Sequence, residues 1–154
     1  MTIKNNIING SGASRYHFTG IYVENPFDET IISNINITNN TIFKQDWVGL
    51  MIGVKIGKQV AHSFIANNLV YSPAAMDLII VDNQGAFTTD KRNIYPFVHP
   101  FISADPTEAI DFQLDSVSLV LDNGVNHAVA CRDFFEKERS SEKRVDIGAF
   151  QFTS

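Results

Sequence analysis

The stretch that decides the fold is "INITNNTI", residues 35–42, in which apolar residues alternate with polar ones before two adjacent asparagines, Asn39 and Asn40. Variants of this phrase occur at 2–9 ("TIKNNIIN") and at 63–71 ("SFIANNLVY"). Alternation of this kind is typical of β-strands, and a recurring phrase indicates a repeated structural unit. The first half of the chain is therefore predicted to be a series of short strands that share one kind of bend.

A second repeated feature is a short apolar run that follows a glycine or a turn. The runs are "GIYVEN" from Gly20, "GLMIGV" from Gly49 and "LIIVDN" from Leu78, so their starts are 29 residues apart each time. Such a period, with short strands and no helical pattern, predicts a solenoid in which equivalent strands of neighbouring coils pair in parallel. The alternative is an antiparallel sandwich with Asn-Asn at its hairpins, although Asn-Gly is the stronger hairpin signal and is absent from the repeated phrase.

The paired asparagines have a physical explanation in a solenoid. At a sharp bend the first residue often needs a left-handed backbone, which asparagine tolerates better than most residues. If the bend recurs in every coil, the side-chain amides lie about 4.8 Å apart along the stack and can hydrogen-bond to one another. We therefore expect a ladder of amides built from the pairs at 5–6, 39–40 and 67–68.

Composition and charge limit the classes of function. Hydrophobic residues make up 44% and charged residues 19% of the 154 residues, as is ordinary for a globular domain. The net charge of -5 and the pI near 5.2 argue against a nucleic-acid partner, which would require a basic surface. No apolar run is long enough to span a membrane, and no signal-peptide pattern is present at the N-terminus.

Metal and cofactor sites are not indicated by the sequence. Cys131 is the only cysteine, so a chain by itself can form neither a disulfide nor a Cys-based metal site. The histidines have no zinc-binding spacing, and no phosphate-binding loop or nucleophile elbow occurs. We therefore expect no metal site and no cofactor.

The C-terminal part carries phrases of another kind: "HPFISADPTEAIDFQLDSVSLVLDNGV" at 99–125 and "RVDIGAFQF" at 144–152. Together with the repeated coils, these phrases resemble the right-handed parallel β-helix proteins of the pectate-lyase-like superfamily. Many bacterial members end with an Asp-Pro-Leu-Phe phrase, a Gly-Ser-Pro-Ala-Ile-Asp-Ala-Gly phrase and an Asp-Ile-Gly-Ala-Tyr-Glu phrase. The positions that match are Pro100, Phe101, Ser118, Asp122, Gly124, Asp146, Ile147, Gly148 and Ala149. The positions that depart are His99, Val117, Leu119, Asn123, Phe150 and Gln151.

The resemblance implies a right-handed parallel β-helix of about three coils, with coils over residues 1–95 and a closing segment over 96–154 packed on the same domain. It also implies a polysaccharide or oligosaccharide partner and an extracellular or periplasmic location. Calcium sites are frequent in that superfamily, but no acidic loop in this sequence has a recognisable run of calcium ligands.

A β-helix of three coils exposes an apolar end unless something covers it. The sequence starts inside the first Asn-Asn phrase, so the N-terminal end is expected to be open. Two explanations stay open: the chain is the C-terminal part of a longer β-helix, or it is complete and its copies pair. Both predict self-association through the open N-terminal end.

The 29-residue period places Glu24, Gly53 and Asp82 at equivalent positions. Two carboxylates would then lie two coils apart, about 9.6 Å at Cα, with a glycine gap between them. This separation is near the upper end of the range of about 6.5–9.5 Å for the carboxyl pair of an inverting glycosidase. The alternative is that both are solvated turn residues.

Nearby cations and aromatic side chains complete the candidate site. Lyases that cut uronic-acid polymers use lysine or arginine in this superfamily, so the resemblance makes Lys55 a candidate catalytic residue beside Glu24 and Asp82. The candidate substrate-binding residues are Lys58, Arg92 and Trp47, with the Trp47 ring available to stack on a sugar. The alternative is that the cations are plain surface charge and that Trp47 anchors a loop.

Three functions are consistent with these observations. The first is a carbohydrate-associated module from a secreted polysaccharide-active protein. The second is a polysaccharide lyase or glycoside hydrolase in its own right, and the third is a structural or adhesin-like module. Because fold alone does not assign function, the choice depends on the site.

Overall fold

The computed structural model describes residues 1–27, 30–127, 131–139 and 144–152, which are almost entirely strand and loop. The strands are β1 (Thr2–Lys4), β2 (Ile7–Asn9), β3 (His17–Val23), β4 (Ile32–Ser33), β5 (Asn36–Thr38), β6 (Thr41–Phe43), β7 (Val48–Ile56), β8 (Val60–Ala61), β9 (Phe64–Ala66), β10 (Leu69–Tyr71), β11 (Ala75–Asn83) and β12 (Thr89–Lys91). A single 3-10 turn, η1 (Ala109–Phe112), is the helical part of the described residues. The predicted all-β class is confirmed.

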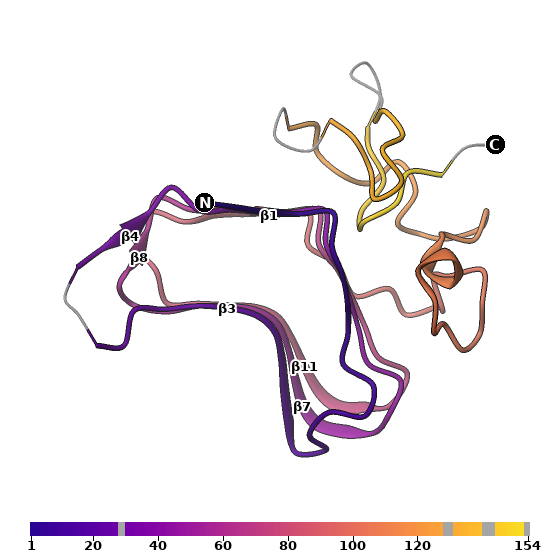
Figure 1. Ribbon diagram of the computed structural model, residues 1–154, viewed down its shortest axis with the longest axis horizontal. Helices are drawn as coiled ribbons and strands as arrows, with labels where there is room; N and C mark the ends of the chain where they lie inside the picture. Colours follow the sequence, from indigo (N-terminus) through magenta and orange to yellow (C-terminus); the bar gives the residue numbers. More distant parts are fainter. Residues whose placement is uncertain (28–29, 128–130, 140–143, 153–154) are drawn as a thin grey trace.

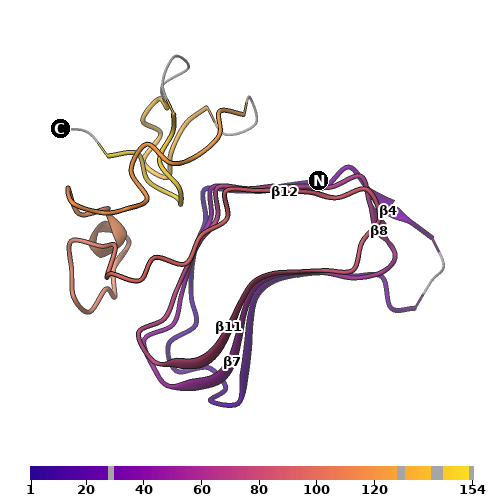
Figure 2. The same ribbon diagram turned by 180° about the vertical axis from the view of Figure 1, so that it is seen from behind.

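The strands form four sheets that the chain visits in a fixed order. Sheet A contains β1, β5, β9 and β12; sheet B contains β2, β6 and β10; sheet C contains β3, β7 and β11; and sheet D contains β4 and β8. Every strand pair in these sheets is parallel. Successive passes of the chain overlie one another in the view down the shortest axis (Figure 1) and from behind (Figure 2). The predicted parallel pairing is confirmed, and the arrangement is compatible with a solenoid.

The bend between sheets A and B carries the asparagine ladder. Asn5, Asn39 and Asn67 have φ of 54°, 55° and 58°, the left-handed values expected at this bend. The next residue of each pair joins the ladder: the Asn40 amide Nδ2 donates to Asn68 Oδ1 at 2.9 Å, as does Asn6 Nδ2 to Asn40 Oδ1. A further rung at Asn93, whose Oδ1 accepts from Asn68 Nδ2 at 2.7 Å, extends the predicted ladder.

Apolar side chains fill the space inside the stacked passes. The inward column Ile3, Ile37 and Ile65 lies in register across sheet A, and the last two are fully buried. The other buried members of this cluster are Ile21, Val23, Ile35, Ile42, Val48, Met51, Val54, Ile56, Val60 and Val70. The alternate apolar residues of the repeated phrases therefore form one continuous core.

Sheet C bends sharply where Gly20 and Gly53 bring it close to sheet B. A Cβ atom at Gly53 would lie 2.4 Å from Val70 Cγ2 and 2.6 Å from the Ile80 carbonyl oxygen, and a Cβ at Gly20 would lie 2.4 Å from Ile42 Cγ2. Only glycine permits this approach. At this bend the two halves of β3, β7 and β11 are angled toward each other on the side that faces away from the core. The outer face of sheet C is therefore concave, as Figure 1 shows. We call it the concave face.

The C-terminal segment packs along the side of the stack, not across its end (Figures 1 and 2). It reaches successive passes at the A–B bend: Asn39 Nδ2 donates to the Asp146 carbonyl at 3.2 Å, and Asn67 Nδ2 donates to the Val125 carbonyl at 2.8 Å. A second apolar cluster joins the segment to sheet B and contains Phe43, Leu69, Tyr71, Phe101, Phe112, Leu114, Val120, Ile147, Ala149 and Phe150. The expectation that this segment closes the end of the stack is therefore wrong.

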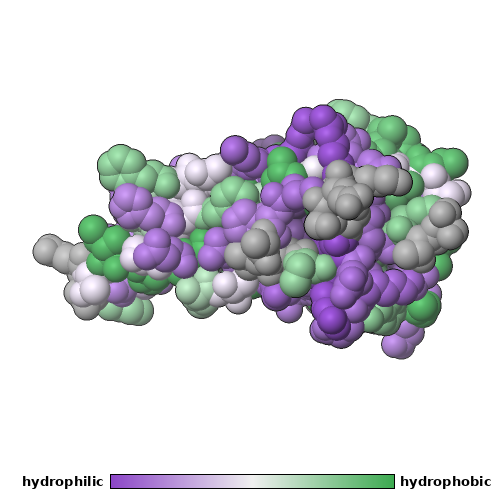
Figure 3. Space-filling model, turned by 90° about the horizontal axis from the view of Figure 1, so that it is seen from above, coloured by the Kyte–Doolittle hydropathy of each residue, from purple (hydrophilic) through white to green (hydrophobic). Residues whose placement is uncertain are grey.

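The surface above sheet A and the C-terminal segment is mixed in character. Seen from above, hydrophilic residues occupy the central part of this face, and hydrophobic residues gather toward its two ends (Figure 3).

Candidate functional site

The strand register of sheet C decides which side chains share the concave face. Tyr22 pairs with Lys55 and Lys55 pairs with Asp82, so these three residues form one column across β3, β7 and β11. The predicted equivalence of Glu24, Gly53 and Asp82 is wrong, because Gly53 lies level with Gly20, between the pairs Thr19–Ile52 and Ile21–Val54. The passes are unequal in length, so a fixed 29-residue period does not give the register: 33 residues separate Tyr22 from Lys55, and 27 separate Lys55 from Asp82.

The corrected register nevertheless brings the three candidate catalytic residues together. Lys55 Nζ lies 3.8 Å from Asp82 Oδ2 and 5.3 Å from the centroid of the Tyr22 ring. The Tyr22 hydroxyl donates a hydrogen bond to Glu24 Oε2. Glu24 itself lies over Gly57, where a Cβ atom would meet Glu24 Cγ at 2.6 Å. We call Tyr22, Glu24, Lys55 and Asp82 the polar cluster.

The polar cluster is accessible without being fully solvated. The side chains of Lys55 and Asp82 are each 28% exposed, and Tyr22 is 51% exposed. The hydrogen bond to Glu24 raises the pKa of the Tyr22 phenol above its ordinary value, and burial and the charges of Glu24 and Asp82 act in the same direction. Tyr22 therefore stays a neutral hydroxyl at physiological pH.

The other arm of the concave face combines apolar and polar residues. Ile52 pairs with Ile79 of β11 and with Thr19 of β3, which forms one column. The next column contains His17, Leu50 and Asp77. A histidine nitrogen, His17 Nε2, lies 2.9 Å from Thr19 Oγ1. The concave face thus joins this mixed arm with the polar cluster across the glycine bend.

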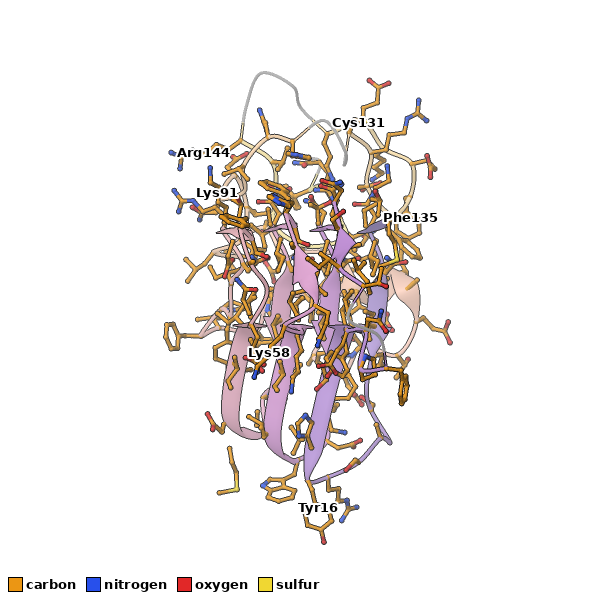
Figure 4. All side chains as sticks on the ribbon, turned by 90° about the vertical axis from the view of Figure 1, so that its left-hand side faces the viewer. Tyr16, Lys58, Lys91, Cys131, Phe135 and Arg144 are labelled. Atoms are coloured by element: carbon orange, nitrogen blue, oxygen red, sulfur yellow. The ribbon has the colours of Figure 1, made fainter. Side chains whose placement is uncertain are left out.

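The three candidate substrate-binding residues occupy different places. Lys58 is exposed in the turn after β7, close in sequence to Lys55 and far from Tyr16 at the opposite end of sheet C (Figure 4). Trp47 is 46% exposed and precedes β7, eight residues from Lys55, which is about 26 Å along an extended strand. Arg92 follows β12 at the A–B bend with φ of 55°. Lys58 thus follows the cluster member Lys55 by three residues, while Trp47 and Arg92 lie outside the polar cluster.

Tyr22 is the site residue that the sequence prediction missed. Alternation makes Tyr22 an outward position, since Ile21 and Val23 on either side are buried. Aligning "GIYV" from Gly20 with "GVKI" from Gly53, by the glycine at the bend, places Tyr22 beside Lys55. The sequence therefore contains the correct alignment. The prediction aligned Gly20 with Gly49, the first glycine of the next run, instead of with Gly53.

The described residues offer neither a metal-binding cluster nor a membrane-spanning helix. Among residues 1–27, 30–127, 131–139 and 144–152, no group of three or more His, Cys, Asp or Glu side chains is arranged to hold a metal ion. No helix in the same residues is long and apolar enough to cross a membrane.

Comparison of this chain with protein-family models, with curated proteins and with solved structures gives no match. The class of the protein is therefore defined by its own architecture: an all-β chain whose parallel strands stack in four sheets.

Proposed function

We propose that the chain is a right-handed parallel β-helix of about three coils, of the pectate-lyase-like class, and that it is a carbohydrate-associated module. In this proposal a polysaccharide or oligosaccharide binds on the concave face, as in a secreted polysaccharide-active protein. The observation that carries the proposal is the column of Tyr22, Lys55 and Asp82 on a concave outer face, with Glu24 hydrogen-bonded to the same tyrosine.

The chemistry of the polar cluster suits a sugar ring. Sugar-binding sites need a flat apolar surface together with a few fixed hydrogen-bonding groups, and the Tyr22 ring beside Lys55 and Asp82 supplies both. The column spans two strand spacings, about 9.6 Å, which is wide enough for one ring. The Lys55 ammonium can also pair with the carboxylate of a uronic acid, so acidic glycans are the favoured class.

Binding is favoured over catalysis at this site. A lyase needs a base that is deprotonated at the working pH, whereas the pKa of Tyr22 is raised by Glu24. Lys55 Nζ is engaged with a carboxylate, 3.8 Å from Asp82 Oδ2. The Tyr22 hydroxyl is therefore not poised to remove a proton, and Lys55 is occupied by its ion pair.

The test measures binding of oligogalacturonate, alginate and chondroitin oligosaccharides, with a neutral glucan as comparison, by titration calorimetry. We expect one acidic glycan to bind and its affinity to fall at least tenfold in Tyr22→Ala and in Lys55→Ala. Tyr16→Ala is the matched control, because Tyr16 is an exposed tyrosine, 83% accessible, just before β3 at the far end of sheet C.

Two outcomes would contradict the proposal. Absence of binding to every glycan would leave a structural or adhesin-like module. Release of unsaturated sugar ends, followed by absorbance and lost in Lys55→Ala, would show that the protein is a lyase.

A further inference from the structure

Because the C-terminal segment lies to the side of the stack, its described residues cover neither end (Figures 1 and 2). At one end β1, β2 and β3 are the outermost strands of sheets A, B and C, and we call this the first edge. At the other end β11 and β12 are the outermost strands of sheets C and A, and we call this the last edge. Unpaired strand edges of this kind are templates for pairing with another chain.

If a second copy stacks its first edge on the last edge in the same register, each column of side chains continues into that copy, and the side chains that meet are complementary. Continuing the column His17, Leu50 and Asp77 would place a second copy's His17 beside Asp77, where an imidazole N–H can donate a hydrogen bond to the carboxylate. Continuing the column Phe18, Met51 and Leu78 would place a second copy's Phe18 over Leu78, so the partly buried apolar side chains at both edges would be covered.

The asparagine ladder is also open at the first edge. Within the stack each ladder oxygen accepts two hydrogen bonds from the preceding rung; Asn68 Oδ1, for example, accepts from the backbone N–H and the side-chain amide of Asn40. The oxygen of Asn6, by contrast, accepts none from the described residues. Asn93 is the last rung, so a second copy's Asn6 oxygen would lie where the next rung belongs.

One residue of the last edge opposes such a contact. Asp90 pairs with Ile65, so it continues the inward column of Ile3, Ile37 and Ile65 with a carboxylate. Its Oδ1 accepts a hydrogen bond from Asn93 Nδ2, which is the donor that a further rung would use. An inward-pointing charge on an edge strand is a known means of blocking strand addition. Lys91 would face a second copy's Lys4 on the outside; this like-charge pair also opposes the contact, but only weakly, because both side chains are exposed to solvent.

We propose that the partner of this chain is a second copy stacked head to tail, with the last edge of one copy on the first edge of the next, and that Asp90 keeps this association weak and reversible. Because the two surfaces differ, the contact is heterologous and does not close on itself. The proposal depends on the strand register alone and is independent of glycan binding.

The first experiment is sedimentation of the wild-type chain and two variants over a range of concentrations. We expect reversible association of the wild type and an association constant at least tenfold larger for Asp90→Ile. Thr89→Ile is the matched control, because Thr89 lies on the same edge strand but belongs to the outward column of Asn36 and Phe64. An Asp90→Ile variant that associates no more tightly than the wild type, or a Thr89→Ile variant that gains equally, would overturn the proposal.

A mixing experiment then tests the direction of the contact. In the Asp90→Ile background, Ile3→Asp blocks the first edge and Leu78→Asp blocks the last edge. Head-to-tail stacking predicts that each blocked variant stays monomeric and that the mixture forms dimers of one copy each, without further growth. If the Leu78→Asp variant pairs with itself, the contact joins two first edges and the proposal is wrong. Asp77→Lys, at an exposed position, is a second last-edge block that leaves the core untouched.

Discussion

At the scale of single residues, the fold depends on asparagine side chains that hydrogen-bond to backbone groups and to one another between neighbouring passes. Asn68 is fully buried and uses its side chain fully: Nδ2 donates to the Ile37 carbonyl at 2.9 Å and to Asn93 Oδ1, while Oδ1 accepts twice from Asn40. Buried polar groups that lose a partner cost about 1–3 kcal/mol each. The ladder is therefore stabilising only while every rung is present.

Replacing Asn68 by alanine should lower the free energy of unfolding by roughly 2–4 kcal/mol, because the buried Asn40 backbone N–H and side-chain amide lose their acceptor and the Ile37 carbonyl loses a donor. Urea unfolding followed by circular dichroism measures the loss. Asn83→Ala is the matched control: Asn83 is exposed and its Oδ1 accepts only from the Gly85 N–H, so its loss should stay below about 1 kcal/mol. Equal losses in both variants would contradict the role of the ladder.

The pKa of Tyr22 reports directly on the polar cluster. Because the hydrogen bond to Glu24 is the main cause of the raised pKa, Glu24→Gln should lower the pKa of this phenol toward its ordinary value of 10.0. Ultraviolet absorbance titration measures it, and the difference from a Tyr22→Phe variant isolates this tyrosine from Tyr16, Tyr71 and Tyr95. An unchanged titration in Glu24→Gln would mean that the two side chains do not interact.

At the scale of elements, the bent strands of sheet C and the C-terminal segment determine the shape around the site. The C-terminal segment is held by Arg139, which is 6% exposed and donates to the carbonyl oxygens of Gly148 at 2.9 Å and Asp146 at 3.1 Å. The same guanidinium reaches Asn5 Oδ1 at 3.3 Å, on the first pass of the stack. Burial lowers the pKa of Arg139 to about 10, so it is still a cation at neutral pH.

Arg139→Met should loosen the C-terminal segment, with a loss of roughly 2–4 kcal/mol, because several buried carbonyl oxygens lose their donor. Hydrogen exchange should show faster exchange over residues 144–152 while β7 stays protected. Arg132→Met provides the comparison, since that side chain is 53% exposed and its ion pairs with Glu136 and Glu138 lie at the surface. If Arg132→Met and Arg139→Met behave alike, Arg139 does not hold the segment.

The sequence predicts some of these elements well and others poorly, for physical reasons. The left-handed bends at Asn39 and Asn67 and the parallel pairing are local consequences of residue type and alternation, so they were predicted. The register of sheet C was not, because loops between sheets can change length without disturbing the columns. Glycines mark both the start of a run, at Gly49, and the bend, at Gly53, and only packing against Val70 distinguishes them.

The position of the C-terminal segment could not be predicted either, because it depends on contacts between residues far apart in the sequence. Its strand-like phrases gave no indication that Gly148 would lie against Thr41 and Leu69 at the side of the stack. Of the candidate site, Glu24, Lys55 and Asp82 were correctly grouped although the register behind the grouping was wrong. The aromatic member, Tyr22, required the true register.

At the scale of the whole molecule, stacking parallel passes produces three surfaces with different chemistry. The concave face carries the proposed glycan site, the A–B bend receives the C-terminal segment, and the two edges are the proposed contact between copies. All three follow from the same columns, since side chains at equivalent positions lie about 4.8 Å apart along the stack. The polar cluster and the edge pairs of His17 with Asp77 and Phe18 with Leu78 both depend on the register of sheet C.

The most direct test of the register is disulfide trapping in a Cys131→Ser background. Lys55 and Asp82 are paired residues on adjacent strands, so Lys55→Cys/Asp82→Cys places two Cα atoms about 4.8 Å apart, within the range for a disulfide. Lys55→Cys/Gln84→Cys tests the 29-residue period instead, and its Cα atoms are about 8 Å apart. Mass spectrometry after mild oxidation should show the cross-link in the first variant and not in the second. A cross-link between positions 55 and 84, with none between 55 and 82, would contradict the account.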